Sequence, residues 1–186
     1  VVASDLSVKM FVQICERLLL DCSSREWRVR QSAAEALAEL FSSGGAGKTF
    51  DIVEKKLAEA WTIAFRVADD IKETVRIRGM MFVKTLRSLS LRLTDANQIG
   101  ESLTSSTRDE KRNVAKKACI LILPQLFEKG LKSDSSVARE LSLFVACEIL
   151  KKAPAEALKP HCVTAVEALL EALSTFEDTR LNYYEQ

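Results

Sequence analysis

The sequence has little of several features that mark common protein classes. Its 186 residues include only six glycines, three prolines and one histidine. Five cysteines are scattered along the chain with no CxxC pair, which favours a reducing compartment and thiols buried as small hydrophobes. No apolar run approaches the roughly 18–20 residues of a membrane span. A disulfide framework and a membrane span are therefore not predicted.

The chain also lacks an excess of charge of either sign. Lys and Arg number 27 against 26 Asp and Glu, for a net charge of +1, and no basic tail or acidic block stands out. A nucleic-acid or membrane partner is therefore not predicted. The chain has no initiator methionine and stops within an apolar pattern at Tyr183 and Tyr184. We expect an internal segment of a longer protein, able to self-associate through the faces around Leu6 and Tyr183.

What the sequence does contain is apolar residues at helical spacing, with no period-two alternation. This pattern predicts an all-α protein with turns near Asp21, Gly44, Asp69 and Pro154. Ser133 to Ser136 would cap one helix start, and Gly130 would cap the preceding helix end. The predicted helices span about 5–20, 26–40, 50–66, 71–93, 111–127, 136–152 and 159–173, with another from about 177.

These helices form hairpins that repeat. The approximate repeats are 5–41, 50–93, 111–152 and an incomplete 158–186, with a polar loop at 94–110. Three turns share an acidic residue followed by a small or β-branched residue and an arginine. The acidic and basic members are Asp21 with Arg30, Asp70 with Arg76, and Asp134 with Arg139. Arg30 and Arg76 stand 46 residues apart, near the ~40–47-residue period of HEAT repeats, which this pattern resembles.

The repeated turn has a structural explanation. Each aspartate lies where a helix N-terminus presents free N–H groups, and we expect the arginine of the following turn to bind it in a bidentate pair. Small residues would let the helix axes approach closely. They are Ala33, Ala34, Ala36, Ala115, Ala118 and Ala146. The prediction is an α-α superhelix of about seven to eight helices in HEAT-like hairpins.

Candidate chemical sites are weak. Residues 42–49 resemble a phosphate-binding loop, but Ser42 replaces its first glycine and a helix rather than a strand precedes it. A nucleotide-binding module using Lys48 and Thr49 therefore remains only a third hypothesis. His161 lies beside Cys162 in a first helical turn, where a surface histidine is expected. No metal, cofactor or catalytic residue is predicted.

Two helices carry basic residues on one face. Lys111, Arg112, Lys116 and Lys117 form the basic stripe, and Arg76, Arg78, Lys84 and Arg87 form a looser set on the helix at 71–93. A solvated face is the ordinary explanation. The alternative is docking of an acidic protein patch or, with less support, of RNA or DNA, because no aromatic residues are interleaved with the charges.

Several segments resemble, in the same order, the large HEAT-repeat proteins of the proteasome adapter and scaffold family. They are residues 24–30 (SREWRVR), 65–76 (FRVADDIKETVR), 123–130 (LPQLFEKG), 158–161 (LKPH), 168–174 (ALLEALS) and 181–183 (LNY). The polar 94–110 segment and Val137-Ala138-Arg139, where Ala interrupts the Val-Arg dyad, depart from the pattern.

This resemblance implies a non-enzymatic scaffold in the cytoplasm and nucleus. It implies binding to regulatory and core particle subunits of the 26S proteasome, bridging of the two particles, and a part in assembly quality control. The alternative is a HEAT scaffold of another system, such as a transport receptor or a phosphatase scaffold.

Overall fold

The structure is a computed structural model that describes residues 8–44, 50–95, 97 and 105–175. Within these ranges the chain is helical and contains no strand, which confirms the all-α prediction. The elements are α1 (Val8–Asp21), α2 (Trp27–Gly44), α3 (Phe50–Ala68), α4 (Glu73–Thr94), α5 (Ser105–Pro124), the π-helix η3 (Gln125–Leu131), α6 (Ser136–Lys152), α7 (Ala155–Leu158), the 3-10 helix η4 (Lys159–His161) and α8 (Cys162–Thr175).

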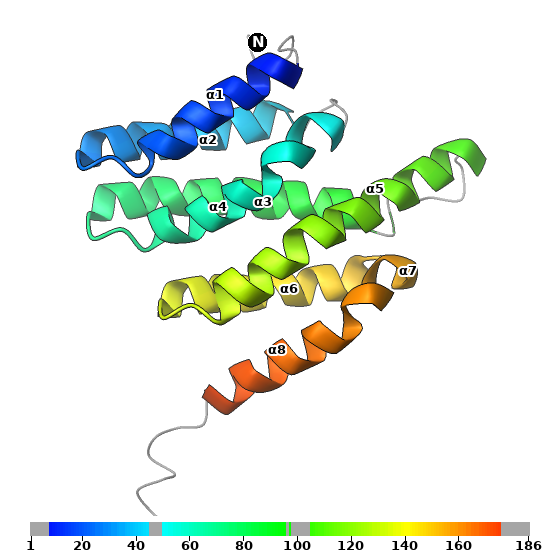
Figure 1. Cartoon of the computed structure of the whole chain (residues 1–186). Coiled ribbons are helices and arrows are strands. Elements are labelled where there is room, and N and C mark those ends of the chain that lie inside the picture. Colours follow the sequence, from blue (N-terminus) through cyan, green and yellow to red (C-terminus); the bar gives the residue numbers. More distant parts are fainter. Residues whose placement is uncertain (1–7, 45–49, 96, 98–104, 176–186) are drawn as a thin grey trace, which may run out of the picture.

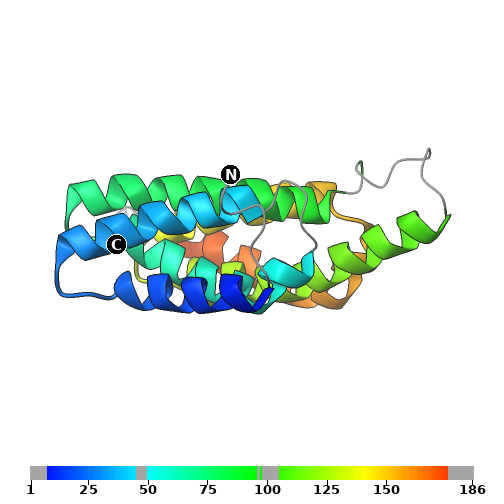
Figure 2. The same ribbon diagram turned by 90° about the horizontal axis from the view of Figure 1, so that it is seen from above.

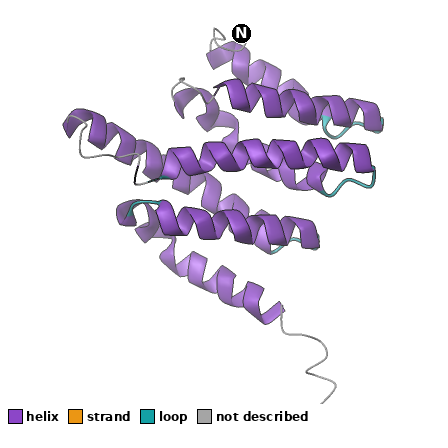
Figure 3. Cartoon of the chain, turned by 180° about the vertical axis from the view of Figure 1, so that it is seen from behind, coloured by secondary structure: helices purple, strands orange, loops and turns teal. Residues whose placement is uncertain are grey.

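The helices are stacked in two layers, as the two views in Figures 1 and 2 show. One layer contains α1, α3, α5 and α8, and the other contains α2, α4 and α6, which lie in front when the molecule is seen from behind in Figure 3. Consecutive elements form three hairpins, α1–α2, α3–α4 and α5–α6, the last closed by η3, which continues α5 and packs on α6. Each hairpin packs on the next along the stack. We call the α1–α2/α3–α4 contact the first junction and the α3–α4/α5–α6 contact the second junction. The arrangement is the predicted α-solenoid.

One continuous apolar core runs between the layers. The rings of Phe11 and Phe41 lie 5.6 Å apart, and those of Phe41 and Phe82 lie 5.8 Å apart, so aromatic contacts link α1, α2 and α4. Trp61 of α3 is fully buried and donates a hydrogen bond from Nε1 to Ser90 Oγ at 3.2 Å. Burying such large side chains supplies ~2–3 kcal/mol each, which no single hairpin could gain alone.

Small residues bring the two helices of a hairpin together. Three positions after each turn arginine stands a buried small residue, namely Ala33, Gly79 or Ser142. The second hairpin is closely packed, because a Cβ added at Gly79 would lie 2.5 Å from the carbonyl carbon and oxygen of Val67. Glycine is therefore required there by close backbone approach and not by backbone conformation.

The structure corrects three local predictions. Helix α5 begins at Ser105, within the segment predicted as a loop, while residues 98–104 lie outside the described residues. Gly130 is not a left-handed helix cap: it lies buried within η3, and no described glycine has positive φ. Pro124 has no N–H to donate, and the wider π-helical turns follow it directly. The predicted Lys159 helix is preceded by α7 and begins as the short η4.

Two sequence predictions at helix ends have different outcomes. Ser135 is the N-cap of α6, since its Oγ accepts a hydrogen bond from the Ala138 N–H at 3.1 Å, which confirms the capping cluster. The helix expected from about 177 lies outside the described residues.

Candidate functional site

The three intra-hairpin turns are built on one local motif. A Ser or Asp begins each turn, and its side-chain oxygen accepts a hydrogen bond from the backbone N–H two residues later. The donor and acceptor pairs are Glu26 N to Ser24 Oγ at 3.2 Å, Lys72 N to Asp70 Oδ1 at 2.9 Å, and Ser135 N to Ser133 Oγ at 3.2 Å.

An arginine six residues later closes each turn. Its Nη1 donates to the backbone carbonyls of the first two turn residues, which would otherwise lack partners near the helix end. The distances are 3.0 and 3.1 Å from Arg30 to Ser24 and Arg25, 2.9 and 3.1 Å from Arg76 to Asp70 and Ile71, and 2.7 and 2.9 Å from Arg139 to Ser133 and Asp134. The repeated arginine thus stabilises its own turn first.

At the first junction one of these arginines also binds the neighbouring turn. Arg30 Nε and Nη2 donate to the two Asp70 carboxylate oxygens at 2.7 and 2.8 Å. The two side chains are only 14% and 11% exposed. The hydrogen bond from Arg30 lowers the pKa of Asp70 below its ordinary value, and the same bond raises the pKa of Arg30.

The order of this pair is opposite to the prediction. The arginine comes from the earlier turn and the aspartate from the later one. Asp21, the predicted acidic residue of the first turn, binds Arg17 of its own helix at 3.1 Å instead. The physical reason is position, because Asp70 stands six residues before its arginine, where the motif begins, whereas Asp21 stands nine before. Asp134, five before, is exposed.

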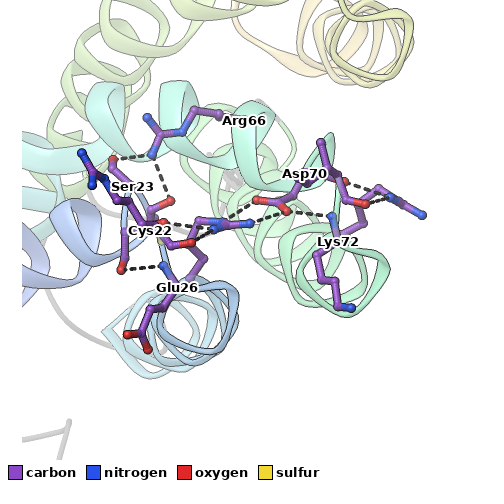
Figure 4. Close-up of polar contacts among 11 residues, drawn as sticks. Cys22, Ser23, Glu26, Arg66, Asp70 and Lys72 are labelled. Carbon is purple, nitrogen blue, oxygen red and sulfur yellow. Dashed lines mark hydrogen bonds and ion pairs between the residues drawn. The ribbon is translucent and has the colours of Figure 1, made fainter.

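Further contacts reinforce the first junction. Arg66, at the end of α3, donates from Nη2 to the Cys22 carbonyl at 2.9 Å and to Ser23 Oγ (Figure 4). The ammonium of Lys72 lies 5.1 Å from the centre of the Trp27 ring, within cation–π range. The first two hairpins are therefore joined along the turn edge by an ion pair, hydrogen bonds and a cation–π contact.

At the same edge of the second junction, no ion pair between described residues joins the two turns. Ser133 occupies the place that Asp70 has in the turn before, so it offers no carboxylate, and among the described residues Arg76 makes no ion pair. A groove of about 330 Å³ lies there, with Arg66 and Asp69 on one side and Lys129 on the other. The turn motif is thus repeated three times, but the pair between turns forms once.

The second junction is held at a different place. Arg87 of α4 donates from Nε and Nη2 to the Glu148 carboxylate of α6 at 2.6 and 2.8 Å, and its guanidinium lies 4.8 Å from the centre of the Phe144 ring. The hydrogen bonds lower the pKa of Glu148 and raise that of Arg87. Sequence spacing predicts for Arg87 only a place in the looser basic set on this helix, because two charges 61 residues apart offer no signal of contact.

The basic stripe predicted on α5 is exposed. Lys111, Arg112, Lys116 and Lys117 all lie on the surface of this helix. Most of the looser basic set on α4 already makes contacts within the chain. Arg76 and Arg87 are bound as described, and Arg78 Nη1 lies 3.4 Å from Glu35 Oε1 of α2. Lys84 is exposed and is not in an ion pair with any described residue.

The predictions for the cysteine and histidine side chains are only partly confirmed. Cys15, Cys22 and Cys119 are buried as predicted, and burial raises the pKa of each thiol, to about 12, 12 and 11. Cys147 is half-buried and Cys162 is exposed, so the prediction is wrong for these two. His161, expected at the surface, is half-buried, and burial lowers its pKa.

Candidate sites for other chemistry are limited. In the described ranges no group of three or more His, Cys, Asp or Glu could hold a metal ion. In those same ranges no helix is both long and apolar enough to cross a membrane. Lys48 and Thr49 of the phosphate-loop resemblance, and the Leu6 and Tyr183 faces, lie outside the described residues.

Stacked hairpins with one repeated turn motif define the class of the protein, a HEAT-type α-solenoid in which each hairpin packs against its neighbours. No protein-family model and no solved structure matches the sequence. Three known proteins do. The chain is 34% identical over 175 residues to the human proteasome adapter and scaffold protein ECM29 and 31% identical over 182 residues to the proteasome component ECM29 of Saccharomyces cerevisiae. It is 24% identical over 198 residues to the proteasome-associated protein ECM29 homolog of Drosophila melanogaster.

These matches cover 94–97% of this chain but only 8–10% of the relatives. The chain is therefore a homologue of the ECM29 proteasome adapter and scaffold proteins, and it spans about a tenth of their length or less. This confirms the family resemblance. The relatives are named as adapter, scaffold and component proteins, in agreement with the expectation of a non-enzymatic protein.

Proposed function

We propose that this chain is a non-enzymatic solenoid segment of a proteasome adapter. Its partners would be regulatory and core particle subunits of the 26S proteasome, and its role would be to bridge the two particles and to take part in assembly quality control, in the cytoplasm and nucleus. The observation that carries the proposal is the similarity over nearly the whole chain to two proteins named for the proteasome, at 34% and 31% identity.

The architecture supports this function because a solenoid presents long, regular surfaces. Each hairpin exposes one face of each helix, so the segment offers several helix surfaces to protein partners at once. The exposed basic stripe on α5 is a candidate docking surface of this kind. The described part of the chain shows no cluster that could hold a metal, and the sequence offers no catalytic motif of its own.

The test is co-purification. The full-length protein that contains this chain, tagged and isolated gently in the presence of ATP, should bring regulatory and core particle subunits with it. A control lacking residues 8–175 should retain fewer if this segment contributes to binding. Recovery of a phosphatase or transport complex without proteasome subunits would reject the proteasome assignment in favour of a scaffold of another system.

A further inference from the structure

The solvent face of α4 combines exposed apolar side chains with free positive charge. Ile77, Met81, Lys84 and Ser88 follow the helix at steps of four, three and four residues, which places them on one face, and all are exposed. Ile77 is 54% exposed, and Met81 and the adjacent Met80 are each 43% exposed. Figure 3 shows α4 open to the viewer between α2 and α6. These residues form what we call the α4 face.

The apolar part of the α4 face lies in one helical turn. Ile77, Met80 and Met81 are at i, i+3 and i+4, so their side chains are neighbours. Arg78 sits beside them, with Nη1 3.4 Å from the Met81 sulfur. Methionine is flexible and polarizable, and it is used at surfaces that adapt to a partner's apolar side chains.

The charged part lies further along the same helix. A groove of about 220 Å³ runs between the end of α2 and the second half of α4. Lys84 and Arg92 stand at its rim, and the buried Phe41 and Leu89 are among its lining residues, with no acidic residue in the lining. Neither cation is in an ion pair with a described residue, in contrast to Arg87 on the neighbouring face.

We propose that the α4 face docks an acidic amphipathic helix of a partner protein. The partner's apolar side chains would cover Ile77, Met80 and Met81, and its carboxylates would bind Lys84 and Arg92. The inference rests on the proposed protein-binding function and names the chemistry of one partner surface. From Ile77 to Arg92 the face is about 22 Å long at 1.5 Å per residue, which an amphipathic helix of about 15 residues would match.

Charge complementarity selects this occupant over the alternatives. From Glu73 to Thr94, α4 has five Lys and Arg and one acidic residue, so an acidic segment is attracted and a basic one is repelled. A nucleic acid would gain from the cations but not from an exposed Ile-Met-Met turn, which offers no aromatic ring for stacking. Glu35, beside Arg78, would also repel its phosphates.

The experiment uses the full 186-residue chain and a designed peptide. The probe is an acidic amphipathic helix of about 16 residues, with leucines on one face and glutamates concentrated at one end. The control peptide has the same composition with its leucines spread around the helix. We expect a dissociation constant of ~10–100 µM for the probe, weakened at least tenfold for the control.

Methionine methyl NMR locates the binding. The chain has three methionines, of which Met10 lies in α1, in the layer opposite to that of α4 (Figures 1 and 2). The resonances of Met80 and Met81 should shift on titration with the probe while that of Met10 stays in place. Equal shifts of all three, or no shift of Met80 and Met81, would overturn the proposal.

Charge-reversed variants complete the test. The double change Lys84→Glu and Arg92→Glu should weaken probe binding at least tenfold, whereas Lys55→Glu with Lys159→Glu, which reverses two exposed lysines outside α4, should leave it within twofold. Unchanged helicity and thermal midpoint would show that both variants fold. Equal weakening in both variants would reduce the effect to net charge and refute the site.

Two further outcomes distinguish helix docking at the α4 face from nucleic-acid binding and from the proposed function. Displacement of the probe by an RNA of about 20 nucleotides at equal concentration would make the face a nucleic-acid site and reject the proposal. If the probe fails to bind while the full-length protein still co-purifies with the proteasome, this inference fails and the proposed function stands.

Discussion

Neutralising Asp70 tests the central contact of the first junction. In Asp70→Asn the amide oxygen can still accept the Lys72 N–H, so the turn is retained, but the charge that binds Arg30 is removed. The pair is bidentate, and both side chains are more than four-fifths buried. Exposed pairs are worth up to ~1 kcal/mol and breaking a fully buried pair costs ~3–5 kcal/mol. This intermediate case should therefore cost about 2 kcal/mol.

The assay is urea unfolding of the chain followed by helical circular dichroism. An exposed pair provides the matched control, because Arg17 and Asp21 are linked at 3.1 Å in α1 with 77% and 27% exposure. Asp21→Asn should cost no more than ~0.5 kcal/mol. A double-mutant cycle with Arg30→Lys should give a coupling energy of ~1–2 kcal/mol between Arg30 and Asp70.

The contribution of the Arg30–Asp70 pair to the free energy of unfolding should decrease at low pH. The pKa of Asp70 is lowered in the folded protein, chiefly by the Arg30 hydrogen bond, relative to ~3.9 in the unfolded chain. The contribution of the pair is therefore complete above about pH 4 and is lost as the pH falls through the folded pKa. The difference in unfolding free energy between wild type and Asp70→Asn should shrink between pH 7 and pH 3. A cost for Asp70→Asn no larger than that of Asp21→Asn, with no coupling to Arg30, would refute the role assigned to the pair.

Three further predictions concern packing, the second junction and self-association. Gly79→Ala should destabilise by ~1–3 kcal/mol in urea unfolding, despite the better helix propensity of alanine, because its Cβ would meet the Val67 backbone at 2.5 Å; a gain in stability would show that α3 and α4 separate freely. Ser133→Asp should place a carboxylate where Asp70 stands in the preceding turn and raise stability by up to ~1 kcal/mol, a gain that Arg76→Ala should abolish. The outer face of α8, where Leu170 is 62% exposed, should drive weak self-association at ~100 µM in sedimentation, and Leu170→Glu should reduce it; a monomeric wild type would contradict this.

Much of the fold could be predicted from residue spacing. The helix ends at Asp21 and Ala68 and the N-cap of α6 follow from local chemistry, because capping and turn residues act within a few positions. The prediction was less accurate where a proline changed the helix type, since the π-helix and the burial of Gly130 depend on what packs against them. Gly130 fits closely against Ser142, because a Cβ added at Gly130 would overlap the Ser142 side chain.

The candidate site was only partly predictable. The turn arginines can be identified because they repeat, but residue type alone does not single out the acidic partner, because Asp21 and Asp134 also precede turn arginines. Alignment on the arginine would have placed Ser24, Asp70 and Ser133 together and shown that only one of the three carries a charge. The Arg87–Glu148 contact had no such signal, because its members belong to different hairpins.

The amino-acid order alone therefore accounts for the helices, the turn motif and the small residues that follow each arginine. These features depend on interactions between residues a few positions apart. The lack of an ion pair at the turn edge of the second junction also follows from the sequence, because position 133 is a serine. The pairing of Arg30 with Asp70 and the exposure of the α4 face depend instead on how the hairpins pack on one another. That packing places large core side chains such as Trp61 and Phe82 between the layers, and no local spacing in the chain encodes it.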